Sequence, residues 1–112
     1  MENFNKQLPH KKILVLLINI QYFSKSETIP KSNQHLLAEL NKNTTNLNKN
    51  FYVLHMHNTL NLPLVRLCYS LINTIYVLLL NIQVFDKTDI NFKADILLEL
   101  SSIKNDFEQL IT

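Results

Sequence analysis

One cysteine and a pair of histidines are the residues of this chain whose types and spacing could carry chemistry. Cys68 follows Arg66 by two residues, and a thiol beside a positive charge can lose its proton and act as a nucleophile. His55 and His57 would point to the same side of a strand, where imidazole nitrogens can bind a metal. The sequence offers no convincing third ligand, so we expect no metal site. The simpler interpretation of Cys68 is a small buried apolar residue.

The composition excludes several classes of site. The 112 residues include no glycine, and a Gly-rich phosphate loop needs glycine where the backbone approaches its ligand. The single cysteine excludes an internal disulfide and fits a reducing compartment, so we expect an intracellular, cytoplasmic protein. The formal net charge is +2, and the basic residues are scattered between Lys6 and Lys104. This distribution does not favour nucleic acid as a partner.

Two apolar segments have some features of targeting or membrane sequences. Lys11 and Lys12 precede the apolar residues 13–20 as in a signal peptide, but no small-residue cleavage site follows. Residues 67–85 are uncharged and long enough to be considered as a membrane span, yet they include three amide side chains. We therefore expect neither secretion nor a membrane partner.

Hydrophobic patterning predicts alternating strands and helices. Apolar residues at three- and four-residue spacing predict helices over residues 32–48, with a polar stop at 48–50, and again from Ala94 to Phe107. Residues 64–80 predict a buried helix, or a helix merged with a strand. Three short segments without helical periodicity predict buried strands, namely residues 13–20, 51–57 and 81–85. This order indicates an α/β fold, a small three-layer αβα domain with a mainly parallel sheet; an all-α helical bundle is the alternative.

Several short motifs resemble one known family. Asn19-Ile20-Gln21, with Phe23 shortly after, stands where isochorismatase-like cysteine hydrolases have Asp, any residue, Gln and a nearby Phe. The segment Arg66-Leu67-Cys68-Tyr69-Ser70-Leu71 is similar to the family's Lys-Thr-x-Phe-Ser-Met, which carries its catalytic lysine. Weaker similarities are residues 52–57 to the family's second strand, Leu60-Asn61 to the Leu-Gly of its eukaryotic members, and Val84-Phe85-Asp86 to a strand that ends at Asp.

The resemblance implies a shortened domain over residues 1–112 with degenerate catalytic positions. Asn19 would replace the carboxylate that accepts the thiol proton, and Arg66 would replace the lysine. The family's nucleophilic cysteine has no clear counterpart, which leaves Cys68 as the available thiol. The resemblance therefore implies a pseudoenzyme of the isochorismatase-like type, without a cofactor.

Three functions follow from these observations. The first is a catalytically degenerate domain that acts as a binding or assembly component of an oligomer or a larger complex, because the few charges between Leu60 and Phe85 indicate a covered surface. The second is a residual cysteine hydrolase that uses Cys68 and Arg66 on a small amide-type substrate. The third is a helical interaction subunit with a seam of Leu40, Leu47 and Leu54.

Overall fold

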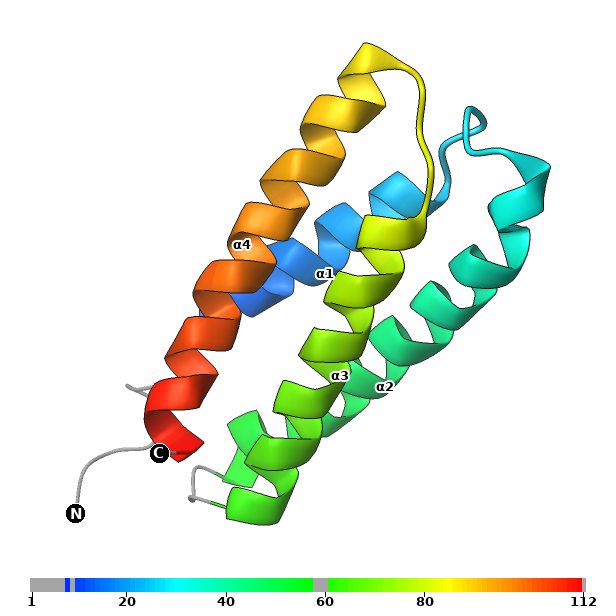
Figure 1. Cartoon of the computed structure of the whole chain (residues 1–112). Coiled ribbons are helices and arrows are strands. Elements are labelled where there is room, and N and C mark those ends of the chain that lie inside the picture. The colour runs from blue at the N-terminus through cyan, green and yellow to red at the C-terminus, as the bar shows by residue number, and fades with distance from the viewer. Residues whose placement is uncertain (1–7, 9, 58–60, 112) are drawn as a thin grey trace.

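Four α-helices account for most of the described chain. A computed structural model describes Leu8, residues 10–57 and residues 61–111. The helices are α1 (His10–Ser24), α2 (Gln34–His57), α3 (Leu62–Asn81) and α4 (Lys87–Ile111), and a 3₁₀ turn, η2 (Lys31–Asn33), precedes α2. They run alternately up and down (Figure 1), and each of α1 and α3 packs between α2 and α4. The result is an elongated antiparallel bundle of 48 × 22 × 21 Å.

The predicted α/β fold is wrong, and the all-α alternative is the observed fold. Residues 10–57 and 61–111 contain no strand, so the resemblance to isochorismatase-like hydrolases, which depends on a sheet, is contradicted as well. Residues 13–20 lie in α1 and residues 51–57 form the end of α2, whereas residues 82–85 connect α3 to α4. One residue of the proposed family similarity, Leu60, falls outside the described residues.

The sequence did not predict helix α1, because this helix is apolar on its outer side as well as on its inner side. Its exposed apolar residues fill the positions between the buried ones, so the sequence reads as an unbroken apolar run without a helical period. Once the exposed residues are set aside, the remaining apolar positions recur every three or four residues, as one face of a helix requires. The buried residues of α1 are Ile13, Leu16, Leu17, Ile20 and Phe23.

Helix α2 continues through residues 48–50, which were expected to end it. Asn43 and Asn50 donate side-chain hydrogen bonds to the carbonyls of Glu39 and Asn46, each at 2.8 Å. Because these amides bond to the helix four residues back, they accompany the helical ladder instead of breaking it. The core face then runs on from Leu47 through residues 51 and 54, and α2 reaches 24 residues.

Helix α3 confirms the helical interpretation of residues 64–80. It begins after Asn61, whose side-chain oxygen accepts a hydrogen bond from the Leu64 amide at 3.1 Å, and Pro63 occupies the first turn, where a missing N–H costs little. It ends at Asn81, and the carbonyl of the next residue, Ile82, accepts a 2.6 Å hydrogen bond from Lys93 Nζ. Burial lowers the pKa of Lys93.

Helix α4 begins where the sequence predicted a polar break. The Asp86 carboxylate accepts hydrogen bonds from the amides of Thr88 (2.9 Å) and Asp89 (3.3 Å), which satisfies two of the unpaired donors of the first turn. The predicted stripe from Ala94 to Phe107 is confirmed as helix, and the final turn extends to Ile111.

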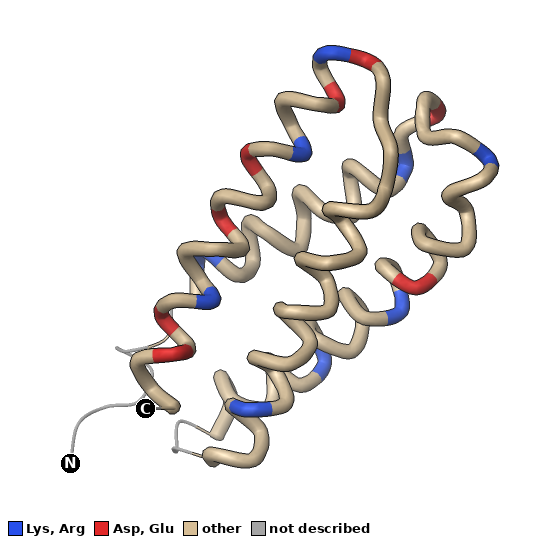
Figure 2. Tube along the Cα trace, viewed as in Figure 1, with Lys and Arg blue, Asp and Glu red and all other residues tan. Residues whose placement is uncertain are grey.

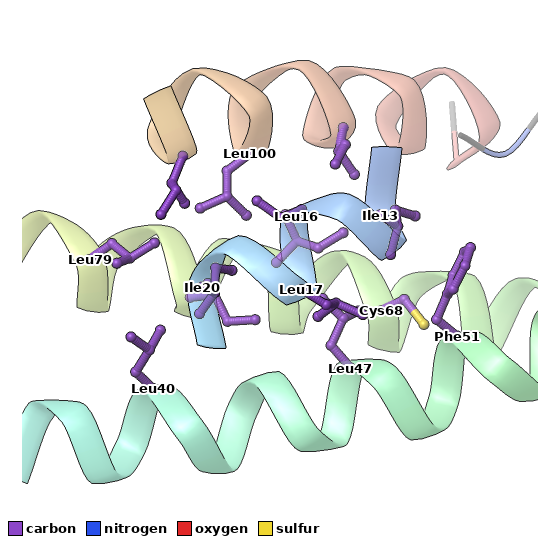
Figure 3. Packing of buried hydrophobic residues seen from close by; sticks show 14 of the residues in the cluster. Ile13, Leu16, Leu17, Ile20, Leu40, Leu47, Phe51, Cys68, Leu79 and Leu100 are labelled. Carbon is purple, nitrogen blue, oxygen red and sulfur yellow. The ribbon is translucent and has the colours of Figure 1, made fainter. Parts of the chain in front are cut away.

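A single apolar cluster joins the four helices. Figure 3 shows Leu16 and Ile20 of α1 lying among Leu40 of α2, Leu79 of α3 and Leu100 of α4. The predicted seam of leucines 40, 47 and 54 is buried in this cluster, so its contacts are within the chain. The buried core fixes α1 on its inner side and leaves the outer side of that helix facing solvent.

Candidate interaction surface

The outer side of α1 carries a row of large apolar residues. Leu14, Ile18 and Tyr22 are spaced by four residues, so they follow one another along the same side of the helix. Their exposed fractions are 52%, 64% and 74%. Val15, next to Leu14, is exposed as well. We call these four residues the α1 outer row.

A groove between α1 and α2 adjoins the outer row. Its volume is about 540 Å³, and Leu14 and Ile18 belong both to the groove and to the row. A smaller pocket of about 70 Å³ continues the groove past Leu14 toward the first turn of α1. The wall that α2 contributes is uncharged and able to form hydrogen bonds; it consists of Asn41, Thr44, Thr45 and Asn48.

Two histidines close the end of the groove near the start of α1. The Nδ1 atoms of His10 and His55 lie 3.2 Å apart, and their rings meet edge to face with centroids 4.7 Å apart. A hydrogen bond between two imidazoles needs one ring nitrogen to donate and the other to accept, so at least one of the rings is neutral. Phe51 packs against His10, with ring centroids 5.3 Å apart. These contacts bind the first turn of α1 to the last turns of α2.

The carboxylates of the bundle are concentrated on one helix. Figure 2 shows acidic residues interspersed with lysines along α4, whereas the charged residues of α1 and α2 are mainly lysines. Helix α1 contains no carboxylate, and Glu39 is the only one in α2. Lys25 lines the groove, and Lys11 is exposed near its other end. Among the described residues that line the groove and the small pocket, none is acidic.

The structure does not bring the three predicted catalytic positions together. Asn19 is half-buried on α1, whereas Arg66 and Cys68 belong to α3. Two residues along a helix differ by about 200° in direction, so Arg66 faces solvent and Cys68 faces the core. Burial raises the pKa of the Cys68 thiol to about 12, and the thiol is therefore protonated near neutral pH.

His55 and His57 lie in a helix and not in a strand, so their side chains do not point to the same side. The geometry that would aim both rings at one metal ion belongs to a strand, and in α2 the two side chains point in different directions. Within residues 10–57 and 61–111, no three His, Cys, Asp or Glu side chains are grouped as a metal site would need.

A second apolar patch lies where α3 passes into α4. Leu80, Phe85 and Ile90 are exposed around a pocket of about 350 Å³, beside the buried stem of Lys93. This patch spans a connection and the ends of two helices, so it lacks the regular spacing of the α1 outer row. It also lies beside α4, where the carboxylates are concentrated (Figure 2).

Helix α3 alone, among the helices that the structure describes, has the length and composition of a membrane span. Its mean hydropathy is 1.6 over an 18-residue window, of which 28% is buried inside the bundle. Core helices of soluble proteins meet the same two criteria, so this finding by itself is weak evidence for a membrane. The residues of α3 that enter the core are Val65, Cys68, Ile72, Ile75 and Leu79.

Sequence reasoning did not find the α1 outer row. The signal was present in the combination of Lys11, Lys12 and a run of eight apolar or amide residues that is too short for a bilayer span. That combination also suits a short helix with one face in a core and the other in an interface. No family model, no curated protein and no solved structure matches the chain.

Proposed function

We propose that this chain is a helical interaction subunit that binds another protein through the α1 outer row. The observation that carries the proposal is the exposure of Leu14, Ile18 and Tyr22 in one continuous row on one helix. Single exposed apolar residues are normal on protein surfaces, whereas a contiguous apolar patch marks an interaction site. Complete burial of a side chain of this size contributes about 1.5–3 kcal/mol, so three of them can supply the core of an interface.

The α1–α2 groove supports the same proposal. Protein interfaces combine an apolar centre with a polar rim that forms hydrogen bonds. Here the apolar centre is the outer row, and Asn41, Thr45 and Asn48 offer amide and hydroxyl groups beside it. Nucleic acid and membrane are not partners in this proposal.

The residual hydrolase alternative has less support. A cysteine nucleophile acts as the thiolate and must meet its substrate, and both requirements oppose a buried thiol whose pKa is about 12. Arg66 is exposed on another side of α3 and offers Cys68 no contact that would favour the thiolate. The groove that could admit a ligand contains neither residue.

A photo-crosslinking amino acid placed in the outer row tests the proposal in the cells that produce the protein. We expect the reactive group at position 18 to form an adduct of discrete mass with another chain. Leu98 on α4 is the matched control, because it is 70% exposed, close to the 64% of Ile18, but stands apart from the outer row. The proposal fails if position 18 gives no adduct, or if positions 18 and 98 give the same adducts in equal yield.

A further inference from the structure

We infer that the partner segment is an amphipathic α-helix whose apolar side is flanked by carboxylates, and that it lies along α1 in the α1–α2 groove. This inference rests on the proposed function and names the chemistry of the partner. It is drawn from the charges that surround the outer row and from the shape of the groove.

A lysine stands beyond each end of the outer row. Lys11 precedes Leu14 by three residues, and Lys25 follows Tyr22 by three, so each lysine stands one helical turn beyond the apolar residues. Both lysines are exposed, and neither has a carboxylate partner among the hydrogen bonds and ion pairs of the described residues. A partner that covers the row therefore meets a lysine at each end, and at the Tyr22 end Asp89 of α4 lines the same pocket as Lys25.

Two lysines of α2 that lie outside the uncharged wall of the groove extend this positive character. Lys42 and Lys49 are exposed on α2, each one residue after an asparagine that lines the groove. The carboxylates of the bundle are instead concentrated on α4 (Figure 2). Opposite charges across an interface speed association and exclude wrong partners, whereas like charges placed together cost free energy. A partner with carboxylates beside its apolar residues meets this arrangement.

The dimensions of the groove suit a helix. Helix α1 has 15 residues and is therefore about 22 Å long, which corresponds to about four turns of a docked helix. A helix that lies in a groove between two helices anchors residues at three- and four-residue spacing, as the outer row presents them. A flat bilayer would cover the outer row but would leave the amide wall at Asn41 and Asn48 without a role.

A second copy of α1 fits this surface poorly. If two α1 helices lay side by side, lysines would meet lysines in both the parallel and the antiparallel arrangement, because both ends of the row are basic. A carboxylate on the partner removes this repulsion.

Two designed peptides of 18 residues test the inference by fluorescence anisotropy with the full 112-residue protein. They share one row of leucines at helical spacing; one peptide has glutamates beside the row and the other has lysines. We expect the acidic peptide to bind at least about tenfold more tightly than the basic one at low salt, with a difference that shrinks as salt is added. The variant Ile18→Asp should lose most of the binding of the acidic peptide.

Charge reversal supplies the matched control. The double variant Lys11→Glu with Lys25→Glu should abolish or invert the preference for the acidic peptide. The double variant Lys87→Glu with Lys104→Glu changes the net charge by the same amount on α4 and should leave the preference intact. Circular dichroism of both variants confirms that they are folded before the comparison is made.

Four results would overturn the inference. These are equal or tighter binding of the basic peptide, no binding of either peptide, binding only to phosphatidylserine vesicles, and self-association of the chain that Asp95→Lys with Glu99→Lys abolishes. The last would assign the groove to α4 of a second copy. If position 18 forms adducts in cells and neither peptide binds, the interaction function stands and the acidic helix is wrong. If position 18 forms no adduct, the proposed function itself fails.

Discussion

Helices α1 and α3 are both rich in apolar residues and differ in what covers them. Helix α3 lies against α2 and α4 along its length, and the Tyr69 hydroxyl donates a 2.6 Å hydrogen bond to the Glu108 carboxylate of α4. That hydrogen bond raises the pKa of Tyr69. Helix α1 also contacts α2 and α4, but an open groove separates its outer side from α2. The apolar residues of α3 thus pack in the core, whereas those of α1 pack in the core on one side and, in our proposal, in an interface on the other.

The exposed apolar residues of α3 and α1 differ in their arrangement. In α3 the exposed Leu67, Val77 and Leu80 are interrupted by polar residues such as Arg66 and Thr74. In α1 the exposed Leu14, Ile18 and Tyr22 follow one another at four-residue spacing, and no polar residue occupies a position of that row. Folding the bundle does not require this continuity, because the core of α1 is complete without it.

The largest expected effect separates the two sides of α1. Leu16→Asp places a carboxylate in the core without a partner, so we expect loss of the folded state. Ile18→Asp, two residues later on the exposed side, should change the free energy of unfolding by no more than about 0.5–1 kcal/mol. Far-ultraviolet circular dichroism and thermal melting provide the measurement. Equal stability of the two variants would show that α1 has no distinct inner and outer sides.

Alkylation of the Cys68 thiol tests how completely the core face of α3 is shielded from solvent. Since burial raises the pKa of Cys68 from 9.0 to about 12, the thiolate fraction at pH 8 falls by about a thousandfold. Alkylation by iodoacetamide should be slower by at least that factor in the folded protein than in urea. Rapid alkylation without denaturant would contradict the burial of Cys68 on the core face of α3.

The same thiol gives the sign of a pH dependence. Above pH 9 the unfolded chain releases the Cys68 proton and the folded chain retains it, so the free energy of unfolding falls as pH rises from 9 toward 12. The variant Cys68→Ala lacks this contribution. Urea denaturation of the two proteins across this pH range measures the difference, because lysines and tyrosines contribute equally to both. If the free energy of unfolding has the same slope against pH in both proteins, the raised pKa of Cys68 is contradicted.

Removing packing from α3 should cost less than placing a charge in the core. Ile75→Ala leaves a cavity in the core, and we expect a loss of about 2–5 kcal/mol in the free energy of unfolding. Val77→Ala, on the exposed side of the same helix, should change it by less than about 0.5 kcal/mol. Urea denaturation measures both. If both substitutions have the same effect, the assignment of the core face of α3 is wrong.

The smallest expected effect concerns the connection that holds α3 against α4. Asp86→Ala removes the acceptor for the amides of Thr88 and Asp89, which should cost about 0.5–2 kcal/mol. Asp95→Ala, on the exposed middle of α4, is the control and should have almost no effect. If Asp86→Ala changes the free energy of unfolding as little as Asp95→Ala does, Asp86 is not the N-cap of α4.

The sequence predicted some of these elements because their polar residues follow the helical period. The stripe from Ala94 to Phe107 alternates with Asp95, Glu99 and Asp106, which marks the exposed side of α4. Residues 13–20 and 51–57 have no such marking, and β-branched and aromatic residues made them resemble strands. The similarity to isochorismatase-like hydrolases arose partly from those same segments and partly from short matches at residues 66–71 and 84–86.

The interaction surface could not be derived from the sequence for a related reason. The residues of the outer row are of the same type as the core residues between them, and only the packing of the bundle separates the two sets. The positions Asn19, Arg66 and Cys68 attracted attention through a family likeness, whereas Leu14, Ile18 and Tyr22 have no reactive group. Their role depends on exposure, which is a property of the fold.

Hydroxyl-radical footprinting of the purified protein and of the protein in its own cells tests the central claim most directly. Ile18 and Leu98 are aliphatic side chains with exposed fractions of 64% and 70%, so their oxidation should be similar in the isolated chain. In cells we predict that the ratio of Ile18 oxidation to Leu98 oxidation falls severalfold, together with oxidation of Tyr22, because a partner covers the α1 outer row. An unchanged ratio would contradict the account.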